Sequence, residues 1–211
     1  MVRLDYIRDP EEIYCQSFET VKSLPELADI EGGIGEVVIR IVHSCGMPDI
    51  VSDLRWSEDF LLAGQNTLSH GARVFCDVES LRNTIMHRLL PEDTQVCCKI
   101  GSLECRAHAA RENCTRAAAQ FDVLGEQLAG SIVVVGNAPT ALFRILENID
   151  NGGAKPALIL GFPVGFVGAA ESKAELAENP RGVPFMTLMG RRGGTAMAAA
   201  CMNAVAAGLA R

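Results

Sequence analysis

The sequence lacks several features that would assign it to a class at once. It has one tryptophan in 211 residues, and 26 acidic residues outnumber 19 basic ones, which leaves a net charge of −7. A negative chain is a poor partner for nucleic-acid phosphates or anionic membranes. No apolar stretch approaches the about 20 residues of a membrane span, and Met1–Asp5 has no signal-peptide pattern. We therefore expect no nucleic-acid partner, no membrane partner and a cytoplasmic protein.

The cysteines form no C-x-x-C pair, although there are eight of them, at positions 15, 45, 76, 97, 98, 105, 114 and 201. Several fall inside expected strands or helices, where cysteine acts as a small buried hydrophobe. Without a secretion signal we expect these thiols to be reduced. We predict no structural metal site.

The glycine-rich turns also lack a nucleotide-binding pattern. Neither Gly136–Thr140 nor Gly161–Gly168 fits G-x-G-x-x-G or the phosphate loop. Pro139 suits the first position of a helix, so the exposed amides there, with the Asn137 side chain, could bind a carboxylate. The alternative is that these glycines only permit tight turns.

Hydrophobic patterning predicts an α/β fold. Strands are expected at 37–42, 72–76, 95–100, 131–135, 157–161 and 184–188. Helices are expected at 10–23, 56–69, 77–89, 111–128, 139–149, 169–177 and 195–209, and Asp9 should cap the first. This alternation indicates one domain over residues 1–211, with a doubly wound, mostly parallel sheet and helices on both faces.

His43 follows the expected strand at 37–42, and Gly46 and Pro48 mark the turn behind it. Open α/β sheets bind ligands at the carboxyl ends of their strands. An imidazole, with an unperturbed pKa of about 6.5, can exchange a proton there at neutral pH. The alternative is a core histidine with both nitrogens satisfied.

Two more polar residues interrupt apolar stretches. Arg40 lies three residues before His43, so on a regular strand the two side chains point to opposite faces. Arg40 would either clamp a substrate carboxylate or form a structural ion pair. Ser17, on the first helix, is either bonded back to its own helix or a ligand contact.

Four stretches together resemble one known family. They are IRIVHSCGMPD, SIVVVGNAPTAL, LILGFPVGFVGAAESK and GRRGGTAMAAACMNA, spread from residue 39 to residue 204. In this combination and order they resemble precorrin-8X methylmutase (precorrin isomerase) of cobalamin biosynthesis. The resemblance implies an isomerase that moves a methyl group from C-11 to C-12 of precorrin-8X or cobalt-precorrin-8, giving hydrogenobyrinic acid or cobyrinic acid.

The resemblance also implies roles for particular residues. His43 would be the catalytic acid/base, and Ser17, in the pair Ser17-Phe18, a substrate contact. Arg40 and Arg116 would meet substrate carboxylates, for which guanidinium groups are well suited. A homodimer is implied, no cofactor is needed, and the next corrin-pathway enzyme is a candidate partner for product transfer.

Other residues keep a structural interpretation. Arg111 and the pair Arg191-Arg192 are either further carboxylate contacts or part of a solvated face. His70, His87 and His108 receive no role, and Cys45 has no assured contact with His43. Two other functions remain open: a non-catalytic tetrapyrrole carrier and a flavodoxin-like oxidoreductase on the same architecture.

Overall fold

The computed structural model describes residues 4–210. The single-domain prediction for 1–211 and the prediction for Met1–Asp5 therefore extend into residues outside the described range. Within that range, no helix combines the length and the apolar character needed to cross a bilayer.

One six-stranded sheet forms the centre of the molecule, in the order β1-β6-β5-β4-β2-β3. Its strands are β1 (Leu54–Trp56), β2 (Val74–Cys76), β3 (Val96–Cys97), β4 (Ile132–Val135), β5 (Leu158–Gly161) and β6 (Phe185–Leu188). All neighbouring strands are parallel except β1, which pairs antiparallel with β6. Every residue of β4, β5 and β6 is buried, because helices cover both faces. The prediction of a mostly parallel, doubly wound sheet is confirmed.

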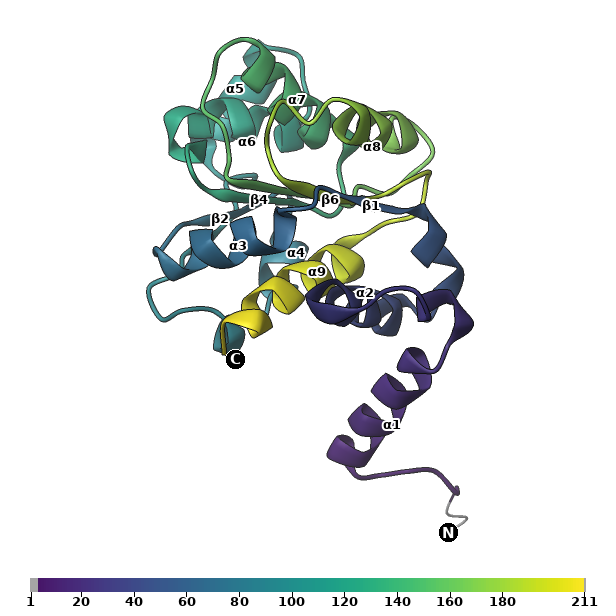
Figure 1. Ribbon diagram of the computed structural model, residues 1–211. Helices are drawn as coiled ribbons and strands as arrows, with labels where there is room; N and C mark the ends of the chain where they lie inside the picture. The colour runs from purple at the N-terminus through teal and green to yellow at the C-terminus, as the bar shows by residue number, and fades with distance from the viewer. Residues whose placement is uncertain (1–3, 211) are drawn as a thin grey trace.

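Two helical layers enclose this sheet (Figure 1). One layer holds α2 (Gly32–Cys45), α3 (Phe60–Ser69), α4 (Glu79–Thr84) and α9 (Thr195–Ala207). The other holds α5 (Leu103–Arg111), α6 (Arg116–Leu124), α7 (Pro139–Asp150) and α8 (Ala169–Glu178). The first helix, α1 (Pro10–Lys22), packs on α2 and projects away from the body (Figure 1). Asp9 caps it as predicted, because its carboxylate accepts the N–H groups of Glu11 and Glu12 at 2.9 Å.

The prediction of a strand at 37–42 was wrong, because this segment lies inside helix α2. A short β-branched apolar run fits a buried strand and a buried helix equally well. Here the helix is buried on most of its circumference, with Val37, Val38, Ile41 and Val42 each at most 1% exposed. Gly46 ends it in the left-handed conformation (φ 68°) and donates its N–H to the Val42 carbonyl.

Further boundaries differ from prediction. The helix expected at 56–69 begins at Phe60, and Trp56 instead ends strand β1. The helix expected at 111–128 begins only at Arg116, where Thr115 caps α6, and continues after Leu124 as a 3₁₀ turn, Gly125–Leu128. Arg111 ends the separate helix α5, which the sequence did not predict, and Asn113 adopts a positive φ between the two helices. The helix expected at 77–89 ends at Thr84 and is followed by a short 3₁₀ turn, His87–Leu89. The strand expected at 95–100 keeps only Val96 and Cys97. Short edge elements have the weakest sequence signals, because few neighbours constrain them.

Candidate active site

The last turn of α2 places His43 and Arg40 on one cavity. On a helix, residues three apart share a face, so the opposite orientations expected from a strand were wrong. Both side chains line a cavity of about 190 Å³. The other lining residues come from α1, from α2, from the end of α4 and the segment after it, and from α9: Tyr14, Phe18, Ser44, Thr84, Met86, Ala196, Ala199, Ala200 and Asn203.

Ser17 and His43 are directly bonded. The Ser17 hydroxyl lies 2.8 Å from Nδ1 of the His43 ring, so it contacts the imidazole rather than its own helix. Either group can be the donor, depending on the tautomer. In both cases Nδ1 is occupied, and His43 Nε2 forms no hydrogen bond with the described residues. The core-histidine alternative does not hold, because His43 is an exposed side chain with one ring nitrogen available.

Aromatic rings hold the imidazole from the side of α1. The Phe18 ring lies 4.8 Å from the His43 ring and the Tyr14 ring 6.0 Å, between centroids. The Arg40 guanidinium lies 5.5 Å from the Phe18 centroid, a cation–π contact. Arg40 forms no ion pair with the described residues, so its charge remains available for a ligand.

Helix α9 forms the opposite wall with small side chains. Ala196, Ala199 and Ala200 line the His43 cavity, and Ala204 and Ala207 line a second cavity of about 260 Å³ with Gly33 and Glu36 of α2. The start of α9 therefore faces the end of α2, and the two helices run antiparallel. Arg40 lines both cavities and so lies between them. Alanines in place of larger residues leave the room for a ligand between the two helices.

The switch point of the sheet is filled by a side chain of the protein itself. Strand order reverses between β2 and β4, where ligands of doubly wound sheets usually bind. Asp77, fully buried after β2, accepts the N–H groups of Gly136, Asn137 and Ala138 at 2.7–2.9 Å. Burial raises the pKa of Asp77, while the three amide donors oppose that rise. These three amides are therefore not available to a substrate carboxylate, and a contact through the exposed Asn137 side chain stays a prediction.

Asn137 and Arg116 lie outside the cavity lining. Asn137 is exposed directly after β4, and Arg116 is the exposed first residue of α6. The start of α6 adjoins the start of α7, since Thr115 and Thr140 share a 2.8 Å hydrogen bond. Gly136 packs against Thr195 at the start of α9, one residue from cavity-lining Ala196. Asn137, the residue after Gly136, is therefore close to the end of the cavity that the start of α9 forms.

Ion pairs and a hydrogen bond that the sequence did not predict hold the loop before α9 in place. Arg192 pairs with Asp49 and Asp53, in the turn that follows α2, and its carbonyl accepts from Lys173 Nζ at 2.5 Å. Lys173 is fully buried and pairs with no carboxylate of residues 4–210, so desolvation lowers its pKa to about 8. Arg191 instead lies over the Phe166 ring. The Arg192 ion pairs favour the structural interpretation of that residue.

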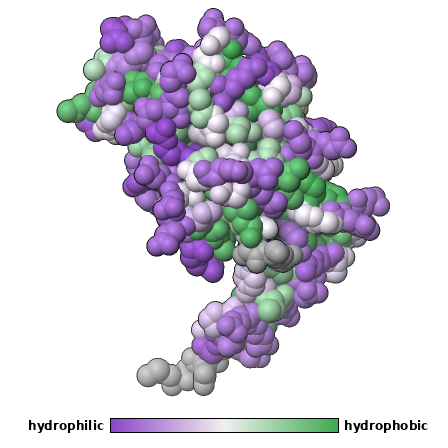
Figure 2. Space-filling model, turned by 60° about the vertical axis from the view of Figure 1, so that its left-hand side comes forward, coloured by the Kyte–Doolittle hydropathy of each residue, from purple (hydrophilic) through white to green (hydrophobic). Residues whose placement is uncertain are grey.

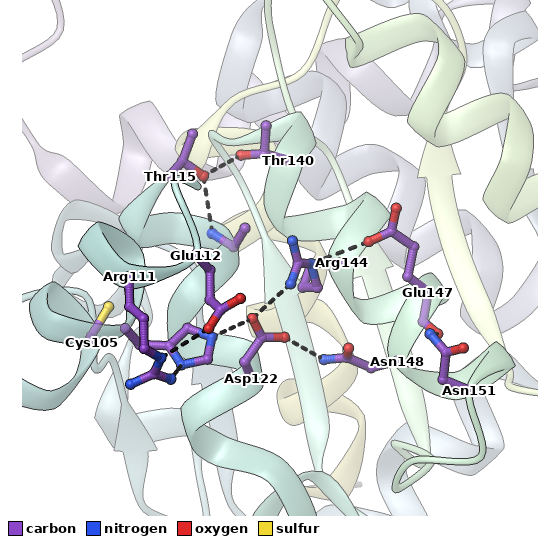
Figure 3. Close-up of polar contacts among 12 residues, drawn as sticks. Cys105, Arg111, Glu112, Thr115, Asp122, Thr140, Arg144, Glu147, Asn148 and Asn151 are labelled. Carbon is purple, nitrogen blue, oxygen red and sulfur yellow. Dashed lines mark hydrogen bonds and ion pairs between the residues drawn. The ribbon is translucent and has the colours of Figure 1, made fainter.

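Histidine and cysteine chemistry elsewhere is limited. His108 is half-buried and bonded to Asp122 and Arg111, both of which are labelled in Figure 3. Burial raises the pKa of the Cys45 thiol, which disfavours a nucleophilic thiolate. Among residues 4–210, no three His, Cys, Asp or Glu side chains gather in a way that could hold a metal ion.

The comparison with known proteins identifies the family. Residues 12–207 match the family model described as precorrin-8X methylmutase. The chain belongs to the precorrin-8X methylmutase family. Membership makes it a methylmutase, an isomerase of cobalamin biosynthesis. The flavodoxin-like alternative is thereby excluded.

Individual members of this family are similar to this protein over almost the whole chain. The precorrin-8X methylmutase of Pseudomonas aeruginosa is 48% identical over 96% of this chain and 98% of its own. That of Sinorhizobium sp is 43% identical over 98% of each chain. The solved precorrin-8X methylmutase of Thermus thermophilus is 31% identical, with a TM-score of 0.82 over 94% of this chain and 97% of its own.

Proposed function

We propose that His43 is the general acid/base of the methyl migration and acts through Nε2. The supporting observation is the Ser17–His43 pair, which occupies Nδ1 and leaves Nε2 without a hydrogen bond to the described residues, on a side chain that lines the cavity. The Phe18 ring packs beside the imidazole, with its centroid 4.8 Å from that of the His43 ring. A positioned acid/base of this kind contributes about 10²–10⁴ in rate.

The reaction is a 1,5-shift of a methyl group from C-11 to C-12 of the macrocycle. His43 protonates, or hydrogen-bonds to, a ring nitrogen or the adjacent carbon framework and so draws electrons through the conjugated system. No bond to the protein forms, and no electrons leave the substrate. The cavity walls hold the ring in one conformation while the methyl group moves.

The metal-free tetrapyrrole is the substrate that the comparisons favour. The relatives at 48% and 43% identity are named precorrin-8X methylmutases, whereas those named cobalt-precorrin-8 methylmutase are 30–36% identical. We expect kcat/KM to be higher for precorrin-8X than for cobalt-precorrin-8. A higher value for the cobalt form would reverse this assignment.

Peripheral carboxylates of the substrate bind to arginines at the ends of the cavity. Arg40 is a cation without an ion pair among the described residues, at the junction of the two cavities. Asn137 and Arg116 stand near the carboxyl edge, and the macrocycle extends from His43 towards them. A cavity of about 190 Å³ is smaller than the roughly 300–1,000 Å³ that encloses a drug-sized ligand, so part of the substrate lies outside it.

A second copy of the chain covers that part in a homodimer. Next to the cavity, α1 exposes Ile13 and Tyr14, at 47% and 45%, and Met86 is 43% exposed. Figure 2 shows hydrophobic side chains gathered on the body beside the projecting helix. Exposed apolar surface of this kind is typical of an interface.

Sedimentation tests the dimer through α1. Ile13→Glu should shift the protein towards monomer and raise KM, because a carboxylate would be buried in the interface. Cys15→Glu is the matched control, since Cys15 is exposed about half a turn round the same helix. Equal behaviour of the two variants would exclude this face of α1.

The cytoplasm is the compartment we propose for the reaction. Every one of the eight cysteines is a free thiol, as expected in a reducing compartment. Whether product passes directly to the next corrin-pathway enzyme is a separate proposal, which competition by unlabelled product in a coupled assay would test.

The decisive experiment replaces His43 and follows the corrin chromophore with chromatography of the product. His43→Ala should lower kcat by about 10²–10⁴ while the variant still binds the pigment. Near-normal turnover would reject His43 as the acid/base. A wild-type protein that binds pigment without changing it would instead be a carrier.

A further inference from the structure

Asn203 is a buried amide in the wall opposite His43. It lies on α9, is 6% exposed and lines the same cavity as His43 and Arg40. Its Oδ1 accepts the backbone N–H of Met86 at 2.8 Å, which fixes the segment after α4 against α9. A buried polar side chain is normally fully hydrogen-bonded, so the second half of this amide requires an explanation.

The contact with Met86 determines which way the amide points. A backbone N–H can bond only to the oxygen of the amide, so the NH₂ group must lie on the other side. That NH₂ group forms no hydrogen bond with the described residues, and it is not among the side-chain atoms that are both unpaired and completely shielded from solvent. It therefore borders open space, and the cavity is the space that Asn203 lines.

Asn203 and Arg40 lie at the same end of the cavity. Helices α2 and α9 run antiparallel, and Asn203 is the last cavity residue on α9 before Ala204, which belongs to the second cavity. Arg40 is the residue shared by both cavities. His43 stands one helical turn further along α2, about 4.5 Å along its axis.

We propose that the Asn203 NH₂ group and the Arg40 guanidinium together bind one peripheral carboxylate of the tetrapyrrole. The arginine supplies the charge and the amide a directed donor, so the pair fixes both the position and the orientation of that group. Because the clamp lies one turn from His43, it sets which part of the ring faces Nε2. This inference rests on the proposed site around His43.

Three variants separate substrate binding from packing. Asn203→Asp keeps an oxygen for the Met86 N–H but replaces the NH₂ donor with a negative charge. It should raise KM about 30-fold, leave kcat within about threefold and leave Tm close to wild type. Asn203→Ala removes both contacts, so it should lower Tm but raise KM less than the aspartate. Asn66→Asp adds the same charge at an exposed position of α3, outside the cavity lining, and should change neither KM nor Tm.

The ranking of the variants decides the outcome. If Asn203 only supported the fold, alanine would be worse than aspartate in both Tm and KM, and that result would overturn the proposal. An unchanged KM for Asn203→Asp, or one no higher than that of Asn66→Asp, would overturn it as well.

A double-mutant cycle tests whether Arg40 and Asn203 bind the same carboxylate. The double variant, Arg40→Met with Asn203→Asp, should have a raised KM. The fold-increase should be at least ten times smaller than the product of the fold-increases in the two single variants. If the two effects on KM multiply, the two residues bind different groups of the substrate, and the proposal of one shared carboxylate is overturned. Turnover retained in His43→Ala would instead reject the whole site, whereas a silent Asn203→Asp beside an inactive His43→Ala rejects this inference alone.

Discussion

The helical layer that carries His43 and the layer that carries Asp122 each contain a histidine, an arginine and an asparagine at one place. The two layers differ in how many of these groups have a hydrogen-bond partner within the chain. Asp122 accepts from His108 and Arg144 at 2.8 Å and from Asn148 at 3.1 Å (Figure 3). In the other layer, His43 Nε2, the Arg40 guanidinium and the Asn203 NH₂ group form no hydrogen bonds or ion pairs with the described residues.

This difference separates a structural cluster from a binding site. Arg111 donates to His108 Nδ1, so the remaining ring proton belongs on Nε2, where Asp122 accepts it. Partners within the chain thus satisfy both ring nitrogens of His108. A group whose partners are all within the chain stabilises the fold, whereas a donor left open at a cavity is available to a substrate.

The largest effect on the Asp122 side should be on stability. Asp122→Ala leaves His108, Arg144 and Asn148 without their shared acceptor, at a side chain that is 14% exposed. We expect a loss of about 3 kcal/mol in the free energy of unfolding, measured by urea denaturation, with an unchanged KM. A tenfold change in KM without loss of stability would contradict the comparison.

Arg40 should show the reverse pattern at a somewhat smaller scale. Arg40→Met removes a cation that pairs with no acidic side chain of the described chain, so stability should hold while KM rises about 30-fold. Arg40→Lys keeps the charge but loses the planar fork, and its KM should lie between the other two. A destabilised methionine variant with normal KM would mean that Arg40 is structural after all.

Ser17 should have a smaller effect, confined to kcat. Ser17→Ala removes the hydroxyl that bonds Nδ1 of His43, so the ring is less well oriented and kcat should fall about fivefold. Ser17→Thr retains a hydroxyl and serves as the control in the same steady-state assay. Equal rates for alanine and serine would show that the rings of Tyr14 and Phe18 orient the imidazole by themselves.

The effect that is spread over the widest pH range concerns Lys173, a buried lysine in the Asp122 layer that departs from the pattern. Its pKa falls from 10.5 to about 8 on folding, so between those values the unfolded chain binds more protons. The unfolding free energy of the wild type should therefore rise with pH relative to Lys173→Met, by at most about 1.4 kcal/mol per pH unit. Denaturation curves for both proteins from pH 7 to pH 10 measure this difference, and parallel pH profiles would contradict a buried, charged lysine.

Much of the fold was predictable because its signals are local. Strands β4, β5 and β6 are continuous apolar runs between turn residues, and α1 and α7 begin at Asp9-Pro10 and Ala138-Pro139. Each was predicted to within about two residues. The site residues His43, Arg40 and Ser17 were also named from the sequence, but their arrangement was not. Asn203 and Lys173 were missed, because an amide or a lysine in a helix carries no signal of what lies opposite.

The sequence by itself determined an apolar, β-branched segment that ends in His43 and stops at Gly46. It did not determine whether that segment is a strand or a helix, since both bury such side chains. Packing between α1, α9 and the turn at Pro48–Asp53 decided for the helix. The choice matters because Arg40 and His43 would face opposite sides of a strand but share one side of a helix, and only the helix places both on one cavity.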